Sequence, residues 1–291
     1  MQNPFDGNYD HSADLQLIEE AVNGSTQALE ALIKRHQHYV YNIALKMVLS
    51  PFDAEEITQE VLIKVVTKLA QFEGKSHFRT WLYRITFNHF LKMKRHWLED
   101  QIVSFDQYGH DLDNIEDTEL TEEEKRSQAE LIKEAKFSCM MGMLLCLNRQ
   151  QRLTYILGEV FSADHNVGAE LLEISKANFR KRLERARADI YQFMNNKCGL
   201  VKKENPCRCA KKTQGFIKEG WVDKDRMKFN TSYVHSIAEV VDEKNAQLAT
   251  LVEEEYALLF QSTPFQEKQH ASQLLTKVFG DKKVKDTFNL N

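Results

Sequence analysis

The sequence contains little glycine and proline, with 11 and 4 of its 291 residues. These residues provide most of the turn geometry that a fold of many short strands needs, so their scarcity favours a mainly helical protein. No apolar run approaches the roughly 20 residues that a helix needs to cross a bilayer. The N-terminus, MQNPFDGNYDHSAD, has no basic stretch followed by an apolar one, so we expect no secretory signal and a cytoplasmic location.

Cysteine is also scarce, and its five residues are an odd number, which argues against a disulfide framework. The sequence has no GxxxxGK, GxSxG, HExxH or dinucleotide-binding fingerprint. These absences favour a protein of a reducing compartment that is not an enzyme and needs no cofactor.

Charge is sorted along the chain, although the net charge is only -4. The segment from Lys75 to Trp97 carries six Lys/Arg and no acid, and the segment from Ser175 to Asp189 carries six Lys/Arg and two acids. Between them, residues 99–124 carry eleven acids and no Lys or Arg; we call this stretch the acidic bridge. Two separate basic surfaces favour a nucleic-acid partner, because Lys and Arg contacts with phosphates supply most sequence-independent affinity.

Apolar periodicity predicts helices over most of residues 13–97 and 127–196, with breaks at Gly24, Ser50–Pro51 and Gly74. We expect Asp53 to cap the helix that follows it. One face of the first basic helix combines aromatic, amide and cationic side chains: Trp81, Arg84, Asn88, Lys92 and Arg95. Such a face suits single-stranded nucleic acid, although a buried helix with a solvated basic edge explains it equally well.

The second basic segment follows a short helix around residues 166–172 and a tight turn, which is the order of a helix-turn-helix. Ser175 is placed to cap its long helix, which runs from Lys176 to about Met194. A plain helical hairpin with a solvated basic face is the alternative.

Both basic segments lie in recognisable strings. DAEEITQEVLIKVVTKLAQFEGKSHFRTWLYRITFNHFLKMKR resembles region 2 of the sigma-70 family, in its extracytoplasmic-function class (group 4). LLCLNRQQRLTYILGEVFSADHNVGAELLEISKANFRKRLERARADI resembles region 4 of the same class. The resemblance covers about residues 13–97 and 131–194 and implies a sigma factor that directs promoter recognition, DNA melting and transcription initiation.

The resemblance assigns roles to three sets of residues. The contact with the coiled-coil clamp of the polymerase β′ subunit would be made by Asp53, Glu56, Gln59 and Glu60. The melted -10 element would be held by Lys75, Ser76, His77, Trp81, Arg84, Asn88, Lys92 and Arg95. The -35 element would be bound in the major groove by Ser175, Lys176, Asn178, Arg180, Lys181, Arg182 and Arg185.

The implied partners are core RNA polymerase (β′ clamp and β flap), promoter DNA and an anti-sigma factor, and the acidic bridge would thread polymerase channels. The sequence departs from the family pattern at the end of region 2 (Lys92–Arg95), at Asn148, where proline is common, and at two residues of the helix-turn-helix. Gly168 lies inside the first helix of the helix-turn-helix, at a cost of about 1 kcal/mol relative to alanine. Glu173 stands in the turn where glycine is usual, and a left-handed conformation there would cost roughly 1 kcal/mol or more.

The expected fold is mainly α, with two small helical domains, a linker and a helical extension. We place a region 2 domain at 1–97, an acidic and mobile linker at 98–126, a region 4 domain at 127–196 and a cysteine-containing extension at 197–291. We expect amphipathic helices around 234–259 and 274–280, with a turn at Pro264–Phe265. The extension, fused directly after the recognition helix, is expected to regulate the factor in cis.

Three cysteines of the extension, Cys198, Cys207 and Cys209, lie among lysines and arginines, which lower thiol pKa and favour thiolate. A structural cluster, a zinc site completed by His235 or His270, and a redox switch stay open, and the spacing matches no common zinc finger.

Two other functions compete with the sigma factor. A stand-alone helix-turn-helix regulator would bind palindromic duplex DNA as a dimer. A thiol oxidoreductase would use Cys207 and Cys209, but no thioredoxin-like context surrounds them.

Overall fold

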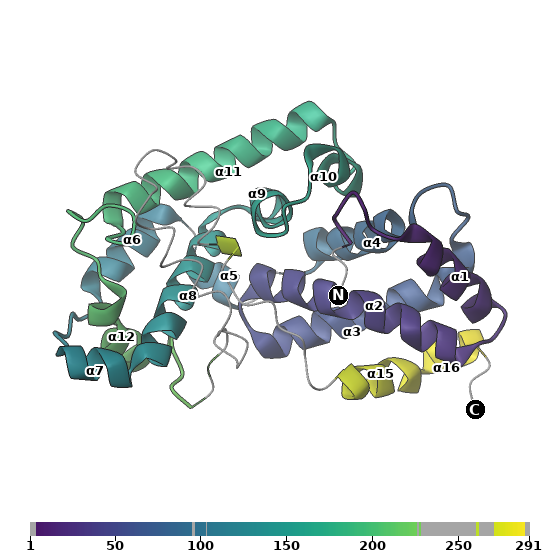
Figure 1. The fold of residues 1–291 in the computed structure, drawn as a ribbon, viewed down its shortest axis with the longest axis horizontal. Helices are drawn as coiled ribbons and strands as arrows, with labels where there is room; N and C mark the ends of the chain where they lie inside the picture. The colour runs from purple at the N-terminus through teal and green to yellow at the C-terminus, as the bar shows by residue number, and fades with distance from the viewer. Residues whose placement is uncertain are drawn as a thin grey trace. The chain divides into compact units, whose positions relative to one another are not determined.

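The computed structural model describes residues 4–94, 97–102, 104–225, 227, 260–261 and 271–288. Within these residues the regular structure is helical, apart from one isolated bridge between Cys198 and Cys207, which confirms the mainly α prediction. The chain divides into two compact units, and each takes segments from distant parts of the sequence (Figure 1). The expected helices between 234 and 259, the turn at Pro264–Phe265, and the residues Arg95, His235 and His270 lie outside the described residues.

Unit 1 contains residues 1–94, 156–181 and 267–291. Its N-terminal part is a bundle of α1 (His11–Val22), α2 (Thr26–Val48), α3 (Pro51–Thr67), the 3-10 turn η1 (Leu69–Gln71) and α4 (Phe78–Lys92). Gly24, at φ 98°, allows the turn between α1 and α2, and Ser25 caps α2. The core between α2, α3 and α4 is lined by Leu29, Leu32, Ile33, Leu62, Val65, Val66, Leu69, Phe78 and Leu82.

The helix α3 begins two residues before the expected cap. Ser50 is the N-cap, because its hydroxyl accepts a hydrogen bond from the Asp53 amide at 3.3 Å. Pro51 then occupies the first helical position, where its missing N–H has no consequence and its fixed φ suits the helix. The prediction that Asp53 caps this helix was therefore wrong, and Asp53 lies in the first turn instead.

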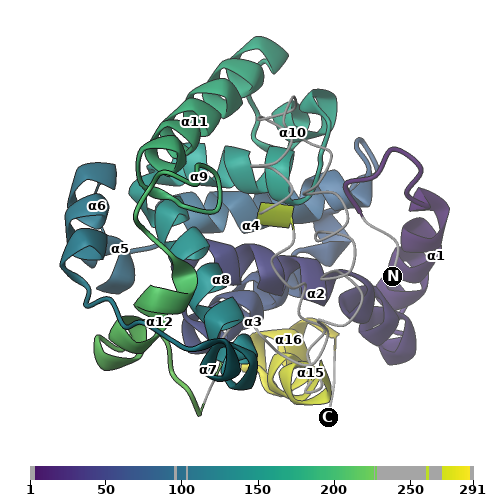
Figure 2. The same cartoon turned by 60° about the vertical axis from the view of Figure 1, so that its left-hand side comes forward.

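Later segments of the chain complete unit 1. The π-turn η2 (Ile156–Val160), α10 (His165–Leu171) and the first residues of α11 (Lys176–Lys197) belong to it, and α10 packs against α4. The C-terminal helices α15 (Ala271–Gly280) and α16 (Lys282–Phe288), yellow in Figures 1 and 2, pack against α3. Leu275, Val278 and Val284 of this pair are buried.

Unit 2 contains residues 95–155 and 182–266. It is built from α5 (Trp97–Gln101), α6 (Phe105–Asn114), α7 (Glu122–Ser127), α8 (Ala129–Cys146), α9 (Arg149–Tyr155), the rest of α11, and α12 (Cys209–Lys218). Arg152 joins these helices from a buried position: it donates to the carbonyl of Leu144 at the end of α8 (2.9 Å) and pairs with Glu99 (2.8 Å).

The acidic bridge is more regular than its weak periodicity suggests. It contains the end of α5, all of α6 and the start of α7, and Tyr108 of α6 is 1% exposed. The Tyr108 hydroxyl donates to the carbonyl of Cys139 in α8 at 2.9 Å. Together with Leu112, which is 4% exposed, Tyr108 anchors this acidic helix on the core of unit 2. Among the described residues, no helix is long and apolar enough to cross a membrane.

Candidate nucleic-acid interface

The segment α10–α11 has the order of a helix-turn-helix, and residues 172–175 form its turn. At the end of α10 the amide of Ile174 donates to the carbonyl of Ala169 (3.1 Å), and the amide of Glu173 donates to the carbonyl of Glu170 (3.3 Å). These two bonds form a Schellman motif, in which the residue just after the helix cap has a left-handed conformation. Glu173 takes this conformation at φ 53°, which confirms the expected strain at a position that favours glycine.

Gly168 has a packing role that outweighs its low helix propensity. A Cβ at this position would lie 2.3 Å from ring atoms of Phe179, the residue of α11 that is 1% exposed. The two helices can therefore approach only because residue 168 has no side chain. The sequence-based cost of about 1 kcal/mol relative to alanine does not describe this site, where alanine would collide with the ring.

The predicted -35 residues lie along the exposed side of α11. Ser175 accepts a hydrogen bond from the Asn178 amide at 3.2 Å, as expected for the cap. Arg182 is half-buried, and burial lowers its pKa. The other members of the set are exposed, and within the described part of the chain none of their cations forms an ion pair: Lys176, Arg180, Lys181 and Arg185.

The predicted -10 face of α4 is partly engaged inside unit 1. The Trp81 ring is half-buried between Phe72 and Phe78, with centroid distances of 5.6 and 5.8 Å. The Arg84 Nε lies 3.0 Å from Oε1 of Glu173 in the turn of the helix-turn-helix, as an ion pair. Asn88 and Lys92 are exposed.

The loop before α4 holds the remaining predicted -10 residues. Gly74 adopts φ 69°, and Lys75, which is exposed, pairs with Glu73. His77 stacks on His11 of α1 with ring centroids 3.7 Å apart. Ser76 is half-buried beside it. The structure thus places the loop against the start of α1.

Sequence reasoning missed the N-terminal segment, residues 4–10, as a part of this interface. Phe5 is 2% exposed, and its ring lies 5.0 Å from Tyr83 of α4 and 5.4 Å from Phe161, which precedes α10. Arg79 of α4 donates to the carbonyls of Pro4 (2.6 Å) and Asp6 (2.7 Å). The segment therefore ties α4 to the chain that leads into the helix-turn-helix.

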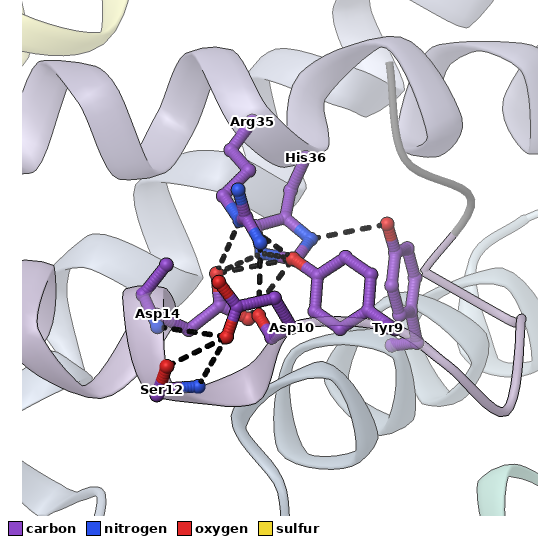
Figure 3. A network of polar contacts seen from close by, with 8 residues as sticks. Tyr9, Asp10, Ser12, Asp14, Arg35 and His36 are labelled. Atoms are coloured by element: carbon purple, nitrogen blue, oxygen red, sulfur yellow. Dashed lines mark hydrogen bonds and ion pairs between the residues drawn. The ribbon is translucent and has the colours of Figure 1, made fainter.

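A buried polar network fixes the end of this segment, as Figure 3 shows. The Tyr9 hydroxyl donates to the carboxylate of Asp14 at 3.0 Å, and Arg35 Nε donates to the same carboxylate at 2.8 Å. The His36 ring lies 3.2 Å from Asp14. Burial raises the pKa of Tyr9 well above its usual range, so its proton stays in place. Periodicity gave no signal for this network, because its members come from the segment before α1, from α1 and from α2, and periodicity does not show which elements meet.

Unit 1 also buries a lysine next to Phe161. Lys46 of α2 is 3% exposed, and its ammonium lies 5.9 Å from the centroid of the Phe161 ring. Burial lowers the pKa of Lys46 from 10.5 to about 8. Keeping this lysine charged at neutral pH therefore reduces the stability of unit 1.

The predicted polymerase-binding residues follow one side of α3. Glu56 and Glu60 are exposed, while Asp53 and Gln59 are half-buried. Glu60 lies 3.4 Å from the ring of His89 in α4. Three of the four side chains carry negative charge, so this surface would suit a basic partner.

Cys139 of α8 lies close enough to the three cysteines of the extension to interact with them electrostatically. The backbones of Cys198 and Cys207 form the isolated β-bridge, and both thiols are free. Burial raises the pKa of Cys207 to about 11 and of Cys209 to about 12. At Cys207 and Cys209 the neighbouring cations do not produce the thiolates expected from the sequence, because the effect of burial on the thiol pKa outweighs theirs. Among the described residues, no group of three or more His, Cys, Asp or Glu side chains is arranged to hold a metal ion.

Comparison with known proteins gives a consistent result. The family Sigma-70 region 2 matches residues 32–97, which span most of α2, α3 and α4. The RNA polymerase sigma-H factor of Pseudomonas aeruginosa is 36% identical over 75 residues, which are 26% of this chain and 39% of that protein. RNA polymerase sigma factor NccH of Alcaligenes xylosoxydans xylosoxydans is 28% identical over 64% of this chain and 97% of its own length.

Two further proteins are similar to this chain. The ECF RNA polymerase sigma-E factor of Escherichia coli K12 is 27% identical over 61% of this chain and 92% of its own length. A solved structure of CnrH in complex with the cytosolic domain of CnrY aligns with a TM-score of 0.42 and 20% identity, over 63% of this chain and 97% of that one. On the sequence matches and the helices that carry them, the chain belongs to the extracytoplasmic-function sigma factors of the sigma-70 family.

Proposed function

We propose that this chain is the subunit that gives RNA polymerase its promoter specificity, and that it acts where core polymerase is, in the cytoplasm. The observation that carries the proposal is that the family match over 32–97 falls on the helices that present the basic α4, while a capped helix-turn-helix presents the basic α11. Two basic surfaces in one sigma factor suit two promoter elements. The expected domain boundaries at 97, 126 and 196 stay predictions.

The -35 element is the proposed ligand of α11. The exposed side chains at its start combine one amide with several cations, which is the combination that reads base edges and holds phosphates in the major groove. Asn178 would contact adenine, and Arg180 guanine. Lys176, Lys181, Arg182 and Arg185 would set the position of the helix on the duplex.

The melted -10 element is the proposed ligand of α4 and the loop before it. Single strands are held by cationic grooves with aromatic platforms, and Trp81 and His77 provide rings beside Lys75, Arg84 and Lys92. Trp81 and Arg84 have partners inside unit 1. We expect DNA to replace the Glu173 carboxylate on Arg84 with a phosphate.

Core polymerase is the proposed partner of α3, through the β′ clamp, and of the helix-turn-helix through the β flap. The acidic side chains Glu56 and Glu60 would meet basic residues there. An anti-sigma factor and zinc at Cys198, Cys207 and Cys209 remain predictions, and metal analysis of the purified full chain tests the latter.

Binding to core polymerase and to forked promoter DNA tests the proposal. We expect the full chain to bind core polymerase with 1:1 stoichiometry and to make the complex prefer DNA with an unpaired -10 segment. Glu56→Lys with Glu60→Lys should weaken core binding, while Glu19→Lys with Glu20→Lys, which reverses two exposed acids of α1, serves as the matched control. A dimer that binds palindromic duplex DNA without polymerase would contradict the proposal and favour the stand-alone regulator.

A further inference from the structure

The acidic bridge is held by the extension within unit 2. The amide of Thr118 donates to the carbonyl of Lys211 in α12 at 2.9 Å. At Gly215 a Cβ would lie 2.4 Å from Cγ2 of Ile115 and 2.7 Å from the carbonyl oxygen of Glu116. The bridge backbone therefore approaches α12 at the one position where that helix has no side chain.

Acids of the bridge are matched to lysines of residues 197–218. Lys212 is 7% exposed on its side chain and lies 3.2 Å from Asp117, and Lys218 lies 3.1 Å from Glu116. The other two pairs join Lys197 to Asp113 and Lys211 to Glu119. Four lysines thus meet four acids along a short segment, so the two segments are complementary in charge.

Apolar contacts add affinity to this match. Ile115 is 6% exposed beneath α12, and the ring of Tyr108 stacks on that of Trp221 with centroids 5.6 Å apart and planes 9° apart. Phe216 of α12 is 2% exposed and lies 5.1 Å from Trp221. Surface ion pairs alone contribute little, whereas buried rings and a matched backbone give one position for the bridge.

We propose that α12, with Lys197 and Trp221, is a docking surface for the acidic bridge, and that this docking lowers the affinity of the chain for core polymerase. We call this surface the α12 clamp. The inference rests on the proposed function and on the role that the family resemblance implies for the acidic bridge, which would thread polymerase channels. Four of the eleven acids of the bridge pair with lysines of the α12 clamp. We expect polymerase to bind the bridge through these carboxylates, which would then have to leave the lysines of the α12 clamp first.

Hydrogen exchange at the Thr118 amide reports docking in the full chain without polymerase. The variant is Lys211→Gln with Lys218→Gln, and the control is Lys202→Gln with Lys224→Gln, which changes charge equally at exposed lysines. Losing two surface ion pairs should speed exchange roughly two- to tenfold, while the control leaves it unchanged. Added salt should speed exchange in the unmodified chain, because screening weakens the same pairs. Equal exchange in variant and control, or no effect of salt, would overturn the docking surface.

Affinity for core polymerase tests the competition. We expect the variant to bind core polymerase about two- to tenfold more tightly than the control. Gly215→Val is a second variant that leaves charge unchanged and should act in the same direction by collision with the bridge. Faster exchange with unchanged or weaker binding would overturn the competition. If neither chain binds core polymerase at all, the proposed function fails, and exchange at Thr118 still decides whether the α12 clamp exists.

Discussion

The two proposed DNA surfaces have similar charge but differ in what surrounds them. The start of α11 presents its amide and cations to solvent, and only Arg182 of that set is half-buried. On α4, by contrast, Trp81 packs among phenylalanines and Arg84 pairs with Glu173. Charge along the sequence therefore locates both surfaces, while their availability depends on neighbours that only the fold brings together.

The difference follows from the ligands proposed for each surface. Duplex DNA is read by side chains that extend into a groove, so such side chains can stay in solvent until DNA arrives. Single strands are held by rings and planar cations, which are also the groups that pack best inside a protein. We infer that α4 exchanges internal partners for DNA, whereas α11 binds without such an exchange.

Removing the ring of Phe5 should have the largest effect, because it removes contacts that hold α4 inside unit 1. Phe5→Ala deletes a ring packed against Tyr83 and Phe161, so we expect unit 1 to lose about 3–5 kcal/mol of unfolding free energy. Urea denaturation measures the loss. Phe52→Ala is the control, because Phe52 is 76% exposed. Equal losses in the two variants would show that the N-terminal segment does not hold α4.

The buried Lys46 should make the stability of unit 1, which holds α4, depend on pH. Its pKa is lowered from 10.5 to about 8, so the folded state binds fewer protons than the unfolded state between these values, and stability rises with pH across this window. The rise should be about 3 kcal/mol for this group. Lys46→Met should be more stable than the unmodified chain at pH 7, and the gap should close toward pH 10.5.

Denaturation curves at several pH values measure this gap, with Lys68→Met as the exposed control. A gap that does not change with pH would mean that Lys46 is charged with equal ease in both states.

Arg180→Ala tests the binding of duplex DNA by the exposed surface of α11. We expect about 1–3 kcal/mol of lost affinity for duplex promoter DNA if this guanidinium reads a base, and no change in the urea midpoint because the side chain is exposed. Lys202→Ala, also exposed but outside α11, is the control. Unchanged affinity in Arg180→Ala would remove α11 from the -35 contact.

Glu173→Gln should have the smallest effect. It would make Arg84 of α4 as available to DNA as the exposed cations of α11. It removes the ion pair with Arg84 while keeping the size of the side chain. Both partners are more than a third exposed, so the pair is worth about 0.2–1 kcal/mol after screening. Affinity for single-stranded -10 DNA should therefore increase by less than about sixfold. A decrease would mean that Glu173 positions Arg84 for DNA instead of competing with it.

Local rules predicted much of this fold. The break at Gly24, the cap at Ser175 and the left-handed Glu173 all depend on one residue and its immediate neighbours, and all three are confirmed. The cap of α3 depended on local chemistry too, but Pro51 at the first helical position moved it to Ser50.

Long-range contacts explain what the sequence could not predict. The role of Gly168 depends on the Phe179 ring in the next helix, and that of Phe5 on Phe161, far along the chain. Tyr108 turns part of the acidic bridge into an anchored helix through contacts with α8 and Trp221. Each of these cases needs a neighbour that periodicity does not identify.

Run-off transcription with purified core polymerase on a library of genomic promoters tests the central claim most directly. The full chain should give transcripts that begin at discrete positions and depend on its presence, and Arg180→Ala with Lys181→Ala should lose most of them. Core polymerase that gives the same transcripts with and without the chain would contradict the assignment of a promoter-specificity subunit.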